Sequence, residues 1–131
     1  MRKVLLLMAV VALMVPAVSV AQATMTAQTQ RVFDDVTRLQ ALLIDATNTQ
    51  INFSAGTWRA VANEANMLAN RIHGRTSSWR SESRSAARDL RMHVREMRAA
   101  ALKGDAAGAR THAAEALPFA STLANRIRGT V

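Results

Sequence analysis

Six arginines recur at helical spacing in the second half of the chain. They are Arg80, Arg84, Arg88, Arg91, Arg95 and Arg98, and we call them the arginine row. Steps of four and three residues, at about 100° per residue, place all six within an arc of about 80° on one helix face. The acids of the same segment, Glu82, Asp89 and Glu96, fall in another sector. Because guanidinium groups bind phosphates and carboxylates through paired hydrogen bonds, the row predicts a docking surface for anions.

A structural explanation of the arginine row competes with this one. Acids on neighbouring helices would neutralise part of the row, and water would solvate the rest. The candidate acids are Asp34, Asp35, Asp45 and Glu64. Lysine is nearly absent, at Lys3 and Lys103 only, so the choice of arginine is not itself evidence of recognition. Both explanations stay open at this point.

The three histidines of the chain are His73, His93 and His112. A helical hairpin around Gly104 would bring His93 and His112 to similar heights, and either Glu96 or Glu115 offers a third metal ligand. A stable zinc site usually has three or four protein ligands, and only two histidines are paired here. The alternative interpretation is that both are structural residues at the edge of the core. The remaining histidine is expected at the end of another helix, far along the molecule.

Other chemistry finds little support in the composition. The chain has no cysteine, which excludes disulfides, thiolate metal sites, a thiol nucleophile and covalent c-type haem attachment. It also lacks a glycine-rich phosphate loop and a His-Glu-x-x-His motif. We therefore expect a protein that is not an enzyme and has no cofactor.

The N-terminus has the three-part layout of a secretory signal peptide. A basic start, Met1-Arg2-Lys3, precedes an apolar run from Val4 to Val15 and a stretch of small residues. The run is about a dozen residues long, whereas crossing a bilayer core needs roughly 20. We predict that residues 1–21 are removed, or 1–23 in the alternative, leaving a basic domain over residues 22–131 without a transmembrane span. Its location would be periplasmic or secreted.

Export limits the anions that the arginine row could meet. Lipid head groups, lipopolysaccharide phosphates and an acidic protein remain as candidates. Nucleic acid is electrostatically feasible but is not expected in that compartment, and the row has no interleaved aromatic side chains on which bases could stack. The sequence does not predict an oligomeric state.

Four amphipathic helices must position these residues. The chain is 50% hydrophobic and 4% aromatic, with five glycines and two prolines, which favours helices over a turn-rich β fold. Apolar residues at spacings of three and four predict helices over about 24–49 and 54–72, the latter capped by Ser54 and stopped by Gly74. A third helix, capped by Ser77 or Ser78, would begin with a buried Trp79.

Lys103-Gly104-Asp105 predicts a compact break before the fourth helix, in which Pro118 should kink or loosen the middle turn. Short connections then favour an all-α, antiparallel up-down-up-down four-helix bundle. The segment 68–74 matches 123–129 at six of seven positions. This echo indicates either two related helical hairpins or two helices that end on the same favourable turn.

The last hairpin resembles a known family. Its alanines at 99–101, its Lys103-Gly104-Asp105 turn and its alanines at 109, 113, 114 and 116 are similar to the soluble periplasmic b-type cytochromes of the four-helix kind and their cytochrome c-prime relatives. The resemblance implies the bundle fold and a haem held by a methionine of the first helix and a histidine near the end of the last. Met25 suits the first position, but 123–127 contains no histidine.

Two functions from different classes follow. The first is an exported, non-enzymatic binding or structural bundle that presents the arginine row to an anionic partner. The alternative is a periplasmic electron carrier that binds haem or a metal. Methionines Met67, Met92 and Met97 are expected to fill the core or the seams between helices.

Overall fold

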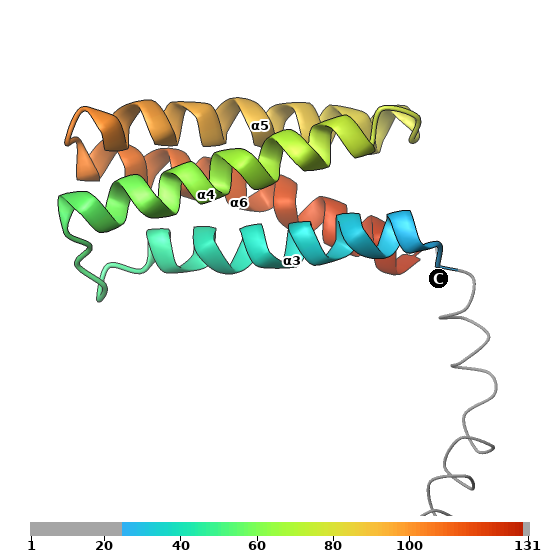
Figure 1. Ribbon diagram of the computed structural model, residues 1–131, viewed down its shortest axis with the longest axis horizontal. Helices are drawn as coiled ribbons and strands as arrows, with labels where there is room; N and C mark the ends of the chain where they lie inside the picture. Colours follow the sequence, from blue (N-terminus) through green and yellow to red (C-terminus); the bar gives the residue numbers. More distant parts are fainter. Residues whose placement is uncertain (1–24, 130–131) are drawn as a thin grey trace, which may run out of the picture.

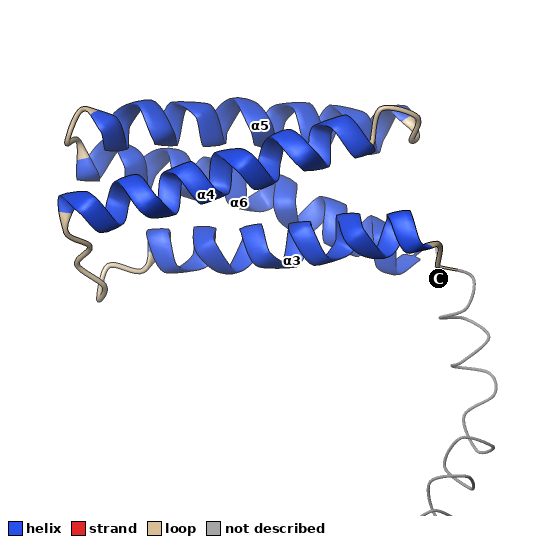
Figure 2. Ribbon diagram, viewed as in Figure 1, coloured by secondary structure: helices blue, strands red, loops and turns tan. Residues whose placement is uncertain are grey.

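The computed structural model describes residues 25–129, and these form four helices and no strand (Figures 1 and 2). Helix α3 spans Ala27–Thr47, α4 spans Ala55–Arg75, α5 spans Ser81–Leu102 and α6 spans Ala106–Gly129. The connections alternate between the two ends of the molecule, so successive helices run antiparallel (Figure 1). The predicted signal peptide lies outside the described residues. Among residues 25–129, no helix is both long and apolar enough to span a membrane.

Each helix packs against its neighbours in the chain, and α6 returns to pack against α3. This closes a square four-helix bundle, as the hydrophobic periodicity predicts. The core is one continuous cluster in which alanine is the commonest residue. Helix α6 buries alanines at four successive contact positions, Ala109, Ala113, Ala116 and Ala120, so its axis can lie close to those of its neighbours.

The turn between α5 and α6 matches its prediction. Gly104 has a φ of +78°, the left-handed conformation that glycine adopts without strain. The amides of Gly104 and Asp105 donate to the carbonyls of Ala101 and Ala100, which is the hydrogen-bond pattern of a Schellman motif. The carboxylate of Asp105 then accepts from the amide of Gly108 and caps α6. The hairpin around Gly104 is therefore set by local chemistry.

Two predicted boundaries around the connection from α4 to α5 are wrong. Gly74 does not stop α4, which continues through Arg75 because Thr76 caps it with both its amide and its hydroxyl on the carbonyl of Ile72. The chain then makes a turn from Thr76 to Trp79. Consequently neither Ser77 nor Ser78 caps α5: Arg80 occupies that position without a side-chain hydrogen bond, and Trp79 is half-buried ahead of the helix.

Other side-chain predictions have mixed outcomes. Ser54 caps α4 by accepting from the amide of Thr57, as predicted. Helix α6 runs unbroken through Pro118. Met97 is fully buried, but Met67 and Met92 are 47% and 46% exposed and do not fill the core. The echoed segments form the last turns of α4 and α6 and bury equivalent side chains, which fits both explanations of the echo.

Candidate functional site

Helix α5 carries the arginine row along the side of the bundle shared with α4. Arg80, Arg84, Arg88 and Arg95 are exposed, whereas Arg91 and Arg98 are half-buried against α4. Among residues 25–129, no hydrogen bond or ion pair engages the side chains of Arg84 and Arg95. The row extends over 18 residues, or about 27 Å at 1.5 Å per residue.

The acids that could have neutralised the row are engaged elsewhere. The Asp35 side chain is only 10% exposed and forms ion pairs of 2.6 Å with Arg71 and 3.1 Å with Arg75, both on α4. Glu64 forms a two-pronged pair with Arg38 of α3. The hydrogen bond from Arg38 holds the pKa of Glu64 below its usual value, and Glu64 raises the pKa of Arg38 in turn.

The nine acidic side chains of the sequence all lie in the described part of the chain, so they can be accounted for completely. Glu82 pairs with Arg126 of α6, and Glu96 and Glu115 contact histidines. Only Asp89 touches the row, at 3.6 Å from Arg88. The four neighbouring acids proposed as neutralising partners make no hydrogen bond or ion pair with the row.

The α4 border of the row is polar but carries no carboxylate. Arg98 donates a 2.8 Å hydrogen bond to the amide oxygen of Asn63, and Arg91 lies 3.2 Å from Nδ1 of His73. Asn66, one turn from Asn63 on the same face, has a buried amide oxygen without a hydrogen-bond partner in the part of the molecule described. The contacts of Arg91 and Arg98 with α4 therefore orient these side chains and involve no carboxylate that would cancel their charge.

One further arginine joins this surface from α4. Arg59 lies one turn before Asn63, on the face that meets Arg98, and its only hydrogen bond within residues 25–129 is a long one to the carbonyl of Ala55. Periodicity within a single helix could not reveal Arg59, because the residue belongs to α4 and the row to α5. Only the antiparallel packing of α4 against α5 shows that Arg59 belongs to the same surface as the row.

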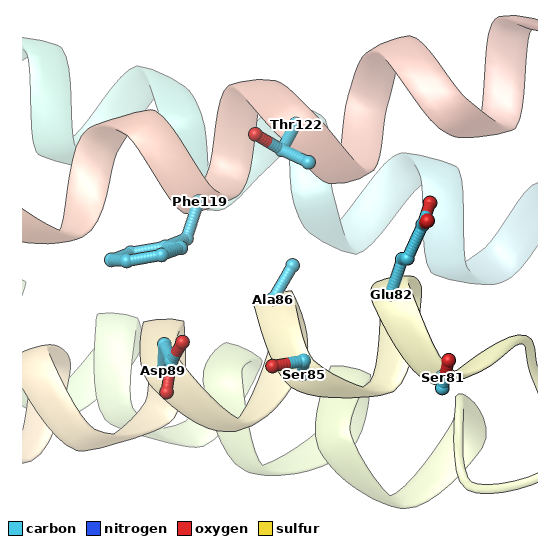
Figure 3. A pocket seen from close by; sticks show the side chains of 7 residues that line it. All are labelled: Ser81, Glu82, Ser85, Ala86, Asp89, Phe119 and Thr122. Atoms are coloured by element: carbon cyan, nitrogen blue, oxygen red, sulfur yellow. The ribbon is translucent and has the colours of Figure 1, made fainter.

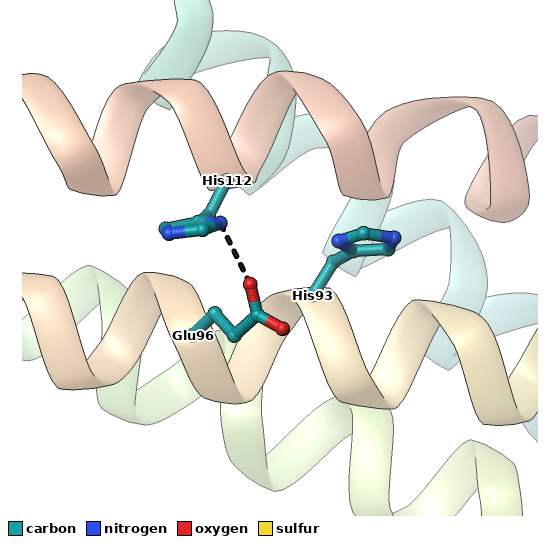
Figure 4. A group of neighbouring side chains, drawn as sticks. All are labelled: His93, Glu96 and His112. Carbon is teal, nitrogen blue, oxygen red and sulfur yellow. Dashed lines mark ion pairs between the residues drawn. The ribbon is translucent and has the colours of Figure 1, made fainter.

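The two histidines of the last hairpin come together, as the prediction requires. Nδ1 of His112 lies 3.0 Å from Glu96 (Figure 4). Glu115 lies 3.3 Å from Nδ1 of His112 and 3.7 Å from Nδ1 of His93. We call these four residues the histidine cluster. It lies between α5 and α6, on the opposite side of α5 from α4. His73 lies in the last turn of α4, at a helix end as expected, where its Nδ1 is 3.2 Å from Arg91.

A hollow of about 510 Å³ opens between α5 and α6 near the start of α5 (Figure 3). Ala86 of α5 and Phe119 of α6 give it an apolar part, and Glu82 and Asp89 stand on its α5 side. The charged lining of the hollow is acidic, in contrast to the arginine row, which it meets at Asp89.

Comparison with known proteins gives no further guide, since no family model, no curated protein and no solved structure matches this chain.

Proposed function

We propose that this chain is an exported, non-enzymatic bundle that docks the α4–α5 side of its surface onto a phosphate-bearing membrane surface. One observation carries the proposal. All nine acidic side chains lie in the described part of the chain, and only Asp89 contacts an arginine of the row. Like charges on one helix face repel one another, and an anionic partner would relieve this repulsion.

The shape of the row favours a surface over a small ligand. A single phosphate can engage one or two guanidinium groups, whereas the row is about 27 Å long and lies on the outside of the bundle. Leu102 lies one turn beyond Arg98 on the same helix face and is 50% exposed. Met92, next to Arg91 in the sequence, is 46% exposed. Apolar side chains next to a basic row suit contact with lipid head groups and the acyl region beneath them.

The export component of the proposal has its own test. We expect N-terminal sequencing of the protein recovered from the exporting cell to begin at Gln22 or Thr24. A retained Met1 in a membrane fraction would contradict the signal-peptide prediction. It would leave the arginine row unaffected, because the row belongs to the folded bundle.

The docking component predicts binding that depends on lipid charge and on salt. The protein should float with vesicles that contain phosphatidylglycerol and remain free in the presence of vesicles of phosphatidylcholine alone. Raising the salt from about 0.1 M to 1 M shortens the screening length from roughly 10 Å to 3 Å, so it should release the protein. A parallel titration with lipopolysaccharide distinguishes the two sources of phosphate. Binding to neither, or binding that salt does not weaken, would contradict docking.

The haem-binding alternative remains a prediction, and the geometry gives it less support. The last turns of α6, where the resembling family supplies a histidine, present Leu123, Ala124 and Ile127 to the core. Met25 packs half-buried at the other partner position. Appearance of a sharp Soret band on adding haem would favour that alternative over membrane docking.

A further inference from the structure

The histidine cluster has an internal symmetry that follows from the hairpin. His93 and Glu96 lie one turn apart on α5, and His112 and Glu115 repeat the same order at the same spacing on α6. Gly104 is midway between Glu96 and His112 and also midway between His93 and Glu115. In an antiparallel hairpin, residues equally distant from the turn face each other. Each histidine therefore meets a glutamate of the other helix.

The distances bring the donor atoms into range of a single ion. One ligand atom from each of His93, Glu96 and His112 lies within 4.8 Å of the other two, and Glu115 approaches both imidazoles. Donors that share a zinc ion at about 2.0 Å are roughly 3.3 Å apart in a tetrahedral site. His112 and Glu96 are already 3.0 Å apart, and the other donor atoms of these three residues would have to approach one another by at most about 1.5 Å.

The imidazole nitrogens are buried and unsatisfied, whereas the carboxylates are open to solvent. Nδ1 of His93 and Nδ1 of His112 have no hydrogen-bond partner in the described molecule, although carboxylate oxygens lie close by. The ring of His93 is stacked on Phe119 at 5.6 Å with the planes 10° apart, which fixes its orientation. The two Nδ1 atoms can act as buried nitrogen ligands, and the two carboxylates lie nearer the solvent. This arrangement suits a metal ion that enters from the solvent side.

We propose that the histidine cluster binds one divalent transition-metal ion, with Nδ1 of His93, Nδ1 of His112 and Glu96 as ligands and Glu115 as the fourth. The mixture of imidazole and carboxylate donors suits zinc or a neighbouring metal and disfavours magnesium and calcium, which prefer oxygen alone. The cluster lies across α5 from the arginine row, so this site is independent of membrane docking.

Ion pairing between histidine and glutamate is the competing explanation of the cluster. That explanation needs protonated imidazoles whose Nδ1–H groups point at the carboxylates. The buried Nδ1 atoms lack hydrogen-bond geometry toward those oxygens, even at 3.0 Å. A metal ion satisfies both nitrogens and both carboxylates at once.

The test is calorimetric titration of the metal-free protein with zinc chloride. We expect one ion per chain with a Kd below about 10 μM, and a melting temperature that rises with zinc concentration. His112→Gln and Glu96→Gln should each weaken binding by roughly tenfold or more. His73→Gln is the matched control, because it removes a histidine from the other side of α5 and should leave the Kd unchanged.

A Kd above about 10 μM for the unaltered protein would overturn the proposal. So would an unchanged Kd in both His112→Gln and Glu96→Gln, or an equal loss in His73→Gln. Melting curves without zinc identify any variant whose fold is damaged. The Kd comparison uses the variants that melt at the same temperature as the unaltered protein without zinc.

Discussion

Replacing Leu90 with alanine is expected to lower the free energy of unfolding by about 2 to 5 kcal/mol. Leu90 is fully buried on α5 and belongs to the small set of large side chains in an alanine-rich core. Truncation removes its apolar contacts and leaves a cavity. Alanines on the facing helices cannot extend to fill that space, so the cost should lie well above the effect of a typical surface change.

Denaturation by urea, followed by circular dichroism at 222 nm, measures this effect. Met92→Ala is the matched control, because it truncates a large side chain on the same helix where it is 46% exposed. We expect Met92→Ala to cost less than about 1 kcal/mol. Equal costs for the two changes would show that α5 does not bury the face that the structure assigns to it.

The sequence predicts the bundle well because the apolar spacing alone determines which face of each helix is buried. Leu39, Leu43, Leu90 and Leu123 recur at helical spacing along their helices and are fully buried. The turn at Gly104 was equally predictable, since a glycine after one helix and an aspartate before the next satisfy local hydrogen-bonding needs.

The errors occur where two local signals compete. Around the end of α4, Gly74 and the two serines after it each offer a plausible boundary, but Thr76 satisfies the carbonyl of Ile72 and prolongs the helix. Periodicity cannot rank such alternatives, because each choice moves the boundary by only a few residues. Exposure of Met67 and Met92 was also missed, since methionine is common both inside and outside a helix seam.

The candidate sites were predictable only in part. Helical spacing identifies the arginine row, but whether it is neutralised depends on which acids lie across each seam. Asp35, for example, turns to Arg71 and Arg75 of α4 rather than toward α5. The contact of Arg110 with the carbonyls of Ala46, Asn48 and Ile51 is likewise a long-range feature that no local pattern contains.

Changing Arg80, Arg84, Arg88 and Arg95 together to glutamine is expected to abolish membrane docking. Near an anionic surface each basic side chain contributes on the order of 1 kcal/mol. Losing four would therefore weaken binding by about 4 kcal/mol, or roughly a thousandfold. Arg91 and Arg98 are left unchanged because their side chains pack against α4.

The same variant should fold at least as well as the unaltered protein. The four side chains are exposed, and their only ion pair within the described bundle is the 3.6 Å contact between Arg88 and Asp89. Removing like charges from one helix face relieves repulsion, and loss of the positive charge at Arg80 suits the N-terminus of α5. A marked fall in melting temperature would instead indicate that the row is held by interactions within the protein.

The most direct measurement compares this variant with a control of equal charge in vesicle flotation. The control changes Arg31, Arg38, Arg126 and Arg128 of α3 and α6 to glutamine. This removes the exposed ion pairs of Arg38 with Glu64 and of Arg126 with Glu82, and the contacts of Arg128 with Asn125 and the Phe33 ring, so melting curves must confirm that the control is folded. Both variants lose four positive charges, but from different surfaces of the bundle. We predict that the control still binds vesicles containing phosphatidylglycerol and that the row variant does not. Equal binding by the two variants, whether retained or lost, would contradict docking through the arginine row.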